Sequence, residues 1–161
     1  MSSRILAAIS TAALLAACNQ SGSEDAENSG ETYIAAHTTM ELMEHVVQPQ
    51  ADILWSAAGS ISDEDGLRYL RPTTEEGWAA VVSSAATISE MGNVLMTPPY
   101  AEGKGEDWIA YSRGLVELGK RNEQALAAQA DEEELMTLGG ELYNVCKACH
   151  EKYQELDIPE G

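Results

Sequence analysis

Residues 131–153 read DEEELMTLGGELYNVCKACHEKY, and this stretch decides the fold. Apolar side chains recur in it every three or four residues, which predicts one face of an amphipathic helix. Asp131 is the expected N-cap and Glu134 the N3 residue, and the acidic first turn suits the positive end of the helix dipole. The apolar row comprises Leu135, Leu138, Leu142, Cys146, Cys149 and Tyr153. Because the row contains two cysteines, we expect the chemistry of the chain on this helix.

The same helix carries the sequence Cys146-Lys147-Ala148-Cys149-His150, a C-x-x-C-H motif typical of covalent haem attachment. Cysteines at positions i and i+3 face the same side of a helix, so both thiols can form thioethers with the vinyl groups of one haem. His150, beside the second cysteine, can place an imidazole nitrogen on the iron. We therefore expect one covalently bound haem c, held by Cys146 and Cys149, with His150 as its proximal ligand.

Two other interpretations of the cysteine pair are open. A redox-active dithiol expects a βαβ context and a helix N-terminus that lowers the thiol pKa, whereas this pair lies near a predicted helix C-terminus. A zinc site needs further ligands and typically a second paired motif. The other two histidines, His37 and His45, are not paired with a cysteine. Haem attachment is therefore the favoured interpretation.

Three segments upstream also repeat apolar residues at helical spacing. The first is predicted over residues 33–58, kinked rather than broken at Pro49, because its apolar stripe stays in phase on both sides. The second is expected to open with Thr73 as N-cap and Glu76 completing a capping box, and to end near Gly92. Together with the third of these segments, given below, and the C-terminal helix over residues 131–153, four amphipathic helices are predicted.

The remaining part of the chain completes the expected fold. A loop is predicted over residues 97–105 and a third helix over residues 106–129. We find no alternation that predicts a strand. The inward positions expected in the first three helices are Met40, Met43, Val46, Val47, Ile53, Leu54, Ala57, Trp78, Val81, Val82, Ala85, Ile88, Trp108, Ile109, Leu115, Leu118 and Leu126. The prediction is an all-α, antiparallel up-down-up-down four-helix bundle with the haem near one end.

The N-terminal segment predicts export and lipidation. Arg4 supplies a positive start, and residues 5–17 are apolar but too few to span a bilayer. Residues 15–18 read LAAC, which resembles the lipobox of bacterial lipoproteins, where the peptide is removed before the cysteine and the thiol receives a diacylglycerol. We therefore expect residues 1–17 to be a lipoprotein signal peptide and Cys18 to be lipidated. An ordinary secretory signal with a chance cysteine is the alternative.

Composition and charge set the remaining expectations. Residues 19–30 are polar and lack periodicity, so residues 18–31 are predicted to be the lipidated cysteine and a flexible acidic tether, followed by one domain over residues 32–161. The chain has 27 Asp and Glu against 9 Lys and Arg, a net charge of −18. This charge repels polyanions and argues against nucleic-acid binding. The same carboxylates suit a redox partner with a basic docking surface.

Taken together, these features resemble the class II c-type cytochromes, the cytochrome c′ group. The resemblance covers about residues 33–155 and rests on a C-terminal C-x-x-C-H motif on the last helix of an exported bundle. It implies one haem near one end of the bundle with His150 as proximal ligand, and homodimers, which such bundles often form through their first two helices. Tyr153 matches a commonly aromatic position, whereas Gln154 stands where the family often has a basic residue.

In that family the sixth position on the iron is either empty, which allows small gases to bind, or filled by a methionine from the first helix. The rise per residue is common to antiparallel helices, so levels can be compared by counting residues. If Ala58 lies level with Asp131, then His150 lies level with about Thr39. The count therefore brings the start of the first helix to the haem.

Two methionines lie near that level. Met43 is the preferred sixth ligand because it shares the inward stripe, and Met40 is the second choice because it lies nearer the helix end. Core packing is the other role open to both side chains. His37 is a weaker candidate for bis-histidine ligation. The loop over residues 92–105 and Trp108 are also expected at the haem end.

The predicted function is that of a lipid-anchored monohaem c-type cytochrome, which transfers electrons in the bacterial cell envelope and is held on the periplasmic side by its lipid. No nucleophile–base motif and no glycine-rich phosphate loop is evident in the sequence, so no enzymatic activity is predicted. The alternative is a five-coordinate haem protein that binds nitric oxide or carbon monoxide. A haemless structural lipoprotein is the third possibility.

Overall fold

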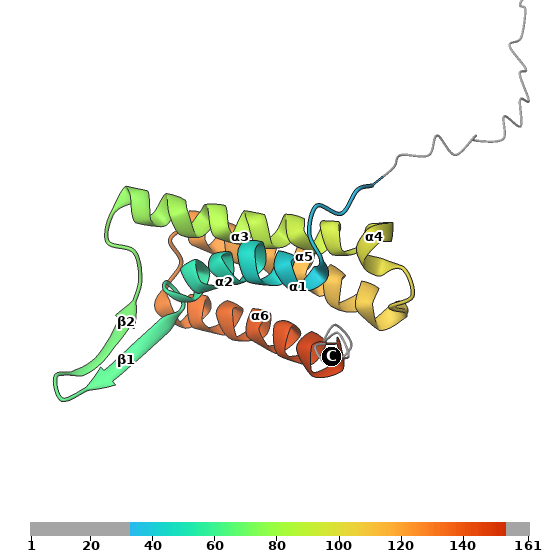
Figure 1. Cartoon of the computed structure of the whole chain (residues 1–161). Coiled ribbons are helices and arrows are strands. Elements are labelled where there is room, and N and C mark those ends of the chain that lie inside the picture. Colours follow the sequence, from blue (N-terminus) through green and yellow to red (C-terminus); the bar gives the residue numbers. More distant parts are fainter. Residues whose placement is uncertain (1–32, 154–161) are drawn as a thin grey trace, which may run out of the picture. The chain divides into compact units, whose positions relative to one another are not determined.

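The computed structural model describes residues 33–153, which are mostly helical (Figure 1). The predicted signal peptide, Cys18, the tether and Gln154 lie outside the described residues. No helix within residues 33–153 is both long enough and apolar enough to cross a membrane. The elements are α1 (Thr39–Leu42), the π-helical turn η1 (Met43–Val47), α2 (Gln48–Trp55), β1 (Gly59–Asp63), β2 (Gly66–Leu70), α3 (Glu75–Leu95), α4 (Pro98–Ala101), α5 (Glu106–Ala127) and α6 (Glu132–Tyr153).

The first helical segment begins at Thr39, six residues later than predicted. Thr38 is its N-cap: the hydroxyl oxygen accepts from the Glu41 N–H at 3.2 Å, and the Glu41 carboxylate accepts from the Thr38 N–H at 2.9 Å. This capping box satisfies two backbone donors that a helix start would otherwise leave open. The expected start was wrong because the apolar spacing of the first helix continues back through residues 33–38, which end at the cap Thr38 and are not helical.

The first segment passes through Pro49 without ending, as predicted. The π-helical turn η1 lies directly before this proline, and its last hydrogen bond runs from the Gln48 N–H to the Met43 carbonyl. A proline has no N–H to donate, and its ring crowds the carbonyl four residues back. A wider turn at this place relieves that crowding, so α1, η1 and α2 follow one another without a break.

The hairpin β1–β2 corrects the prediction that the chain contains no strands. The strands pair antiparallel, from Gly59 opposite Leu70 to Asp63 opposite Gly66. Gly66 has a φ of 110°, a left-handed conformation that favours glycine, and the Asp65 N–H donates to the Asp63 carboxylate at 3.1 Å. An Asp-Gly pair such as Asp65-Gly66, flanked by alternating residues, is a known hairpin signal. The prediction missed it because the segments on both sides show helical spacing.

Helix α3, the second helix predicted from the sequence, begins and ends later than predicted. Thr74, not Thr73, is the N-cap of α3, because the Thr74 hydroxyl accepts from the Gly77 N–H at 3.1 Å. The helix then runs past Gly92 to Leu95. Gly92 does not end the helix but allows α5 to approach, since a Cβ there would lie 2.6 Å from the Ser112 carbonyl oxygen.

A second glycine brings α3 and α5 together. A Cβ on Gly119 of α5 would lie 2.7 Å from the Ser89 backbone nitrogen of α3. The buried Ser89 hydroxyl donates to the Val116 carbonyl at 3.0 Å across the same interface. The α3–α5 interface is therefore a close contact between two backbones.

The other helices pack on this pair. α6 packs against α5 and α2 against α3 (Figure 1). The buried Asn122 side chain of α5 donates to the Leu138 carbonyl of α6 at 3.3 Å. As predicted, the Asp131 carboxylate caps α6 by accepting from the Glu134 N–H at 2.9 Å. The predicted loop over residues 97–105 contains the short helix α4.

Most predicted inward positions lie in one core. Two were wrong: Met40 is 48% exposed and Ile53 is 38% exposed. Several others are only partly buried but pack against the core. The predicted residues that are buried are Val47, Leu54, Ala57, Trp78, Val81, Ala85, Ile88, Trp108, Leu115, Leu126, Leu135, Leu138, Leu142 and Tyr153.

Candidate functional site

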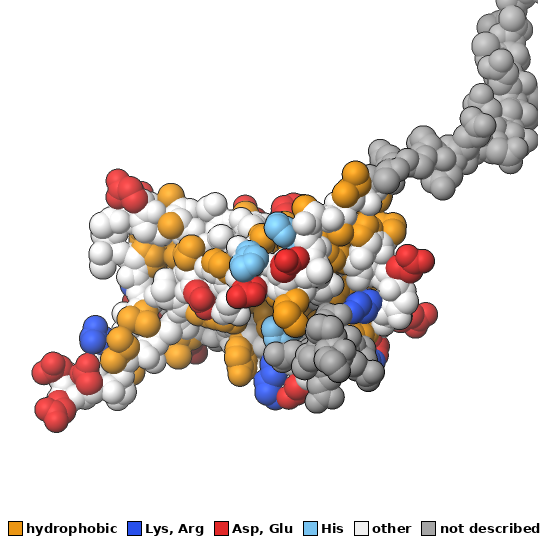
Figure 2. Space-filling model, viewed as in Figure 1, with side chains coloured by type: hydrophobic (Ala, Val, Ile, Leu, Met, Phe, Trp, Pro, Cys, Tyr) orange, Lys and Arg blue, Asp and Glu red, His pale blue; other side chains and the backbone are white. Residues whose placement is uncertain are grey.

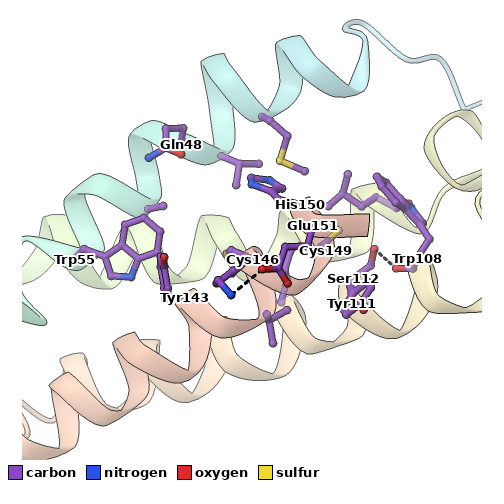
Figure 3. A pocket seen from close by; sticks show the side chains of 17 residues that line it. Gln48, Trp55, Trp108, Tyr111, Ser112, Tyr143, Cys146, Cys149, His150 and Glu151 are labelled. Atoms are coloured by element: carbon purple, nitrogen blue, oxygen red, sulfur yellow. Dashed lines mark hydrogen bonds and ion pairs between the residues drawn. The ribbon is translucent and has the colours of Figure 1, made fainter. Parts of the chain in front are cut away.

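A pocket of about 450 Å³ lies between the first helical segment and α6. Its walls come from η1 and α2 on one side, from α5 and α6 on the other, and from Leu95 at the end of α3. Its volume falls within the roughly 300–1,000 Å³ of pockets that hold cofactors and small ligands. Cys146, Cys149 and His150 all line it, so the structure brings the three predicted attachment residues to one cavity (Figure 3).

Both cysteines are partly buried on the pocket side of α6, and they form no disulfide with each other. Burial, with a smaller contribution from the neighbouring Cys149, raises the pKa of the Cys146 thiol to about 11. This thiol is therefore protonated at neutral pH. Redox-active dithiols show the opposite shift, because a lowered pKa supplies their reactive thiolate.

His150 lies at the mouth of the pocket, and in Figure 3 its ring points towards the helical segment that carries Gln48. The residue also lines a smaller pocket of about 130 Å³, together with Met40 and Met43. Met43 lines both pockets, whereas Met40 lines only the smaller one. The structure thus places both methionines beside His150, with Met43 the more enclosed of the two.

The register assumed for the first helix and α6 was wrong. A Cβ on Gly139 would lie 2.7 Å from the Ala58 Cβ, so Ala58 faces Gly139 and not Asp131. The Trp55 indole N–H also donates to the Gly139 carbonyl at 3.4 Å. His150 follows Gly139 by eleven residues along α6. Because the first helical segment runs antiparallel to α6, the residues level with His150 lie eleven positions before Trp55 and Ala58, at positions 44 to 47. The corrected level is closer to Met43 than to Met40.

The other histidines lie away from the pockets. His37 and His45 are both exposed, and neither lines the two pockets that contain His150. The His37 backbone carbonyl accepts from the Tyr100 hydroxyl at 3.2 Å, which fixes the segment before α1 to α4. The structure therefore does not bring His37 to the attachment residues.

Aromatic residues close the end of the pocket at the start of α5. Trp108 is buried, lines both pockets and donates from its indole N–H to the Leu95 carbonyl at 2.7 Å. The Tyr153 ring meets it edge to face, with centroids 5.1 Å apart. The Tyr153 hydroxyl donates to the Lys104 carbonyl at 3.0 Å. Trp108 and Leu95, from the segments expected near the haem, thus lie against the cysteine pair's cavity.

Sequence reasoning missed the residues at the other end. Trp55 and Tyr143 line the pocket there, with ring centroids 6.1 Å apart. Gln48 lines the mouth between the two ends. Tyr143 does not belong to the predicted apolar row of α6, so only its contact with Trp55 connects it to the pocket.

Two ion pairs involve the C-terminal half of α6, and the residues of the first pair line the pocket. Lys147 forms an ion pair with Glu151 at 2.7 Å, one turn apart on α6. Lys152 pairs with Asp107 and so ties the end of α6 to the start of α5. Across residues 33–153, no three His, Cys, Asp or Glu side chains gather as a metal-binding cluster.

No family model, no curated protein and no solved structure matches the chain.

Proposed function

We propose that the chain is a lipid-anchored, monohaem c-type cytochrome of the class II, four-helix type, which transfers electrons in the bacterial cell envelope. One observation carries the proposal: both thiols and the imidazole of a single C-x-x-C-H motif line one cavity of about 450 Å³. A methionine thioether, that of Met43, lines the same cavity. Imidazole nitrogen and thioether sulfur are the axial ligands that electron-transfer haems use.

The lining of the cavity suits a covalent haem. Its wall is largely apolar and aromatic, which suits a macrocycle, and Cys146 and Cys149 lie one turn apart on α6. Bound there, a haem supplies reversible one-electron chemistry between ferric and ferrous iron. The thiols and the imidazole that line the cavity therefore support the proposal of haem attachment.

The surrounding residues have distinct roles in this proposal. Cys146 and Cys149 would hold the group covalently, and His150 would bind its iron. Met43 is the proposed ligand from the first helical segment. Trp108, buried and hydrogen-bonded to the Leu95 carbonyl, excludes water from one end of the cavity. Burial and axial ligation together set the reduction potential.

The alternatives for the cysteine pair are disfavoured on physical grounds. A dithiol oxidoreductase needs a thiolate, whereas burial raises the pKa of Cys146 to about 11. The pair also lies near the C-terminal end of α6, where the helix dipole disfavours negative charge. Both observations support thioether formation in preference to thiol redox chemistry.

The experiment that tests haem attachment is extraction of the purified exported protein. We expect the haem to remain bound in acid–acetone and to give a pyridine haemochrome of the two-thioether type. Cys146→Ala combined with Cys149→Ala should release it, because no covalent bond then remains. Ala148→Ser, between the cysteines, is the matched control and should retain haem. Haem extracted from the wild type, or absent from it, would refute the proposal.

Anchoring is tested separately at Cys18. We expect the mature protein to begin at Cys18 and to carry a diacylglycerol, which mass spectrometry of the N-terminal peptide measures. Cys18→Ser should abolish both processing at this site and membrane association, whereas Ser21→Ala should change neither. An unlipidated N-terminus downstream of Cys18 in the wild type would contradict lipid anchoring and leave haem attachment untouched.

A second candidate function is gas binding by a five-coordinate haem. It is favoured by the smaller pocket of about 130 Å³ between His150 and the two methionines, which leaves room for a diatomic molecule. Carbon monoxide added to the ferrous wild type distinguishes the functions. Rapid binding to a high-spin haem supports the gas-binding function, and a low-spin spectrum that resists carbon monoxide supports electron transfer.

A further inference from the structure

The pocket wall nearest the hairpin leads to the surface through two aromatic rings. Trp55 of α2 and Tyr143 of α6 both line the pocket and meet edge to face, with centroids 6.1 Å apart and an interplanar angle of 67° (Figure 3). The Trp55 indole N–H is held by the Gly139 carbonyl at 3.4 Å. Tyr143 is 52% exposed. The pair therefore runs from the cavity to solvent.

Tyr143 leaves a large aromatic side chain about half exposed to solvent. It lies on the same face of α6 as Met136, two turns earlier, and Met136 is 40% exposed. Packing against the core therefore buries only part of each of these two side chains. Exposed tyrosine and methionine are enriched in protein interfaces, where a rigid ring covers a large area at little entropic cost. This strip of α6 has the composition of a contact surface beside the pocket mouth.

A pocket-lining residue of α2 is hydrogen-bonded to an exposed carboxylate. Gln48 lines the pocket and donates to the exposed Asp52 carboxylate at 2.6 Å, and exposed Glu44 precedes Gln48 by four residues. On the α6 side, Lys147 and Glu151 neutralise each other. Acidic side chains also lie across the face seen in Figure 2, with apolar side chains between them. A net charge of −18 opposes a second copy of this chain and favours a cationic partner.

We propose that Tyr143, in edge-to-face contact with Trp55, is the contact through which a basic one-electron redox protein docks at the pocket mouth and exchanges electrons with the group held in the pocket. The proposal rests on the haem function proposed above. One electron passes between the partner's metal centre and the haem: the donor is oxidised by one electron and the acceptor reduced by one. No covalent bond forms or breaks, and no proton is transferred.

The test uses the haem-loaded protein and a lysine-rich blue-copper protein as the basic probe. Stopped-flow spectroscopy measures the rate of electron transfer from the reduced copper protein. Titration calorimetry of the two oxidised proteins measures affinity independently of any reaction. Hexaammineruthenium(II), a small cationic reductant, provides a reference that needs no docked protein surface. The variants are Tyr143→Ala and Tyr143→Phe, with Tyr69→Ala as matched control, because Tyr69 is a tyrosine of similar exposure, 46%, on the hairpin.

We expect Tyr143→Ala to weaken binding of the copper protein about tenfold and to slow the reaction with it by a similar factor. Tyr143→Phe and Tyr69→Ala should stay within about twofold of the wild type, and Tyr143→Ala should lose a larger factor in rate with the copper protein than with hexaammineruthenium(II). Equal losses from Tyr143→Ala and Tyr69→Ala, no loss from Tyr143→Ala, or no binding by the wild type would overturn the docking proposal.

The two proposals fail in distinguishable ways. A wild type without a pyridine haemochrome refutes the cytochrome function itself. A wild type that carries haem and reacts with hexaammineruthenium(II), but whose Tyr143→Ala variant binds the copper protein normally, refutes only the docking surface. An equal slowing of Tyr143→Ala with hexaammineruthenium(II) and with the copper protein would show damage to the haem site and would also overturn the docking role.

Discussion

The α3–α5 interface and the α2–α6 side are built in opposite ways. At the first, Gly92 and Gly119 leave no room for a side chain, and the two helix backbones touch. At the second, contact is confined to one end, where Gly139 meets Ala58, and a cavity of about 450 Å³ separates the rest. One side of the molecule is therefore closely packed, while the other leaves a cavity between its helices.

The largest effect is expected from breaking the close interface. Gly119→Ala places a methyl group about 2.7 Å from the Ser89 backbone nitrogen, so the helices must move apart, at a cost of about 2 kcal/mol in the free energy of unfolding. Chemical denaturation measures this loss. Gly140→Ala on α6 is the matched control: its Cβ meets nothing, so the higher helix propensity of alanine should stabilise by about 0.5–1 kcal/mol. Equal effects at the two glycines would contradict the close contact.

A change on the cavity side should alter the site more than the fold. Met43→Ala removes a partly buried side chain, at a cost of about 1 kcal/mol in stability. If its thioether binds the iron, the same change converts a low-spin absorption spectrum to high-spin and lets ferrous iron bind carbon monoxide. Met40→Ala, 48% exposed in the wild type, should leave the spectrum as it is. Conversion by Met40→Ala instead would assign the ligand to the other methionine.

The smallest effect concerns an ion pair remote from both regions. Arg71 donates to the Glu132 carboxylate at 2.7 Å, and this hydrogen bond lowers the Glu132 pKa below its usual 4.5. A lowered folded-state pKa stabilises the protein above pH 4.5, and the contribution is lost as the pH falls through the folded pKa. Glu132→Gln should therefore lower the melting temperature slightly at neutral pH and not at all in strong acid. A difference that grows on acidification would contradict the assignment.

Sequence patterns predicted what depends on local spacing. The cap at Asp131, the buried row of Leu135 and Leu142, and passage of the first helix through Pro49 all follow from residues a few positions apart. The grouping of Cys146 with His150 follows in the same way, since one helical turn places them on neighbouring turns of one face. Local pattern thus placed Cys146, Cys149 and His150 close together on α6 before any tertiary contact was known.

Tertiary contacts decided the rest. The register of Ala58 against Gly139 depends on which small residue permits close approach, and no periodicity reports this. Gly92 resembled a helix end, but the backbone of α5 occupies the space beside it. The hairpin was missed because its few alternating residues lie between two strong helical signals. Tyr143 lay outside the predicted apolar row, and only its contact with Trp55 connects it to the pocket.

The π-helical turn η1 has a consequence for the geometry of the site. A turn wider by one residue rotates everything before it by about 100° relative to a regular α-helix, since each residue of such a helix advances by that angle. Met43 opens this turn, while Leu54 lies in the core beyond it. The direction of the Met43 side chain is thus uncoupled from the phase of α2. Deleting Glu44 would reset that phase, so a single-residue deletion can redirect the Met43 side chain while every core contact of α2 keeps its place.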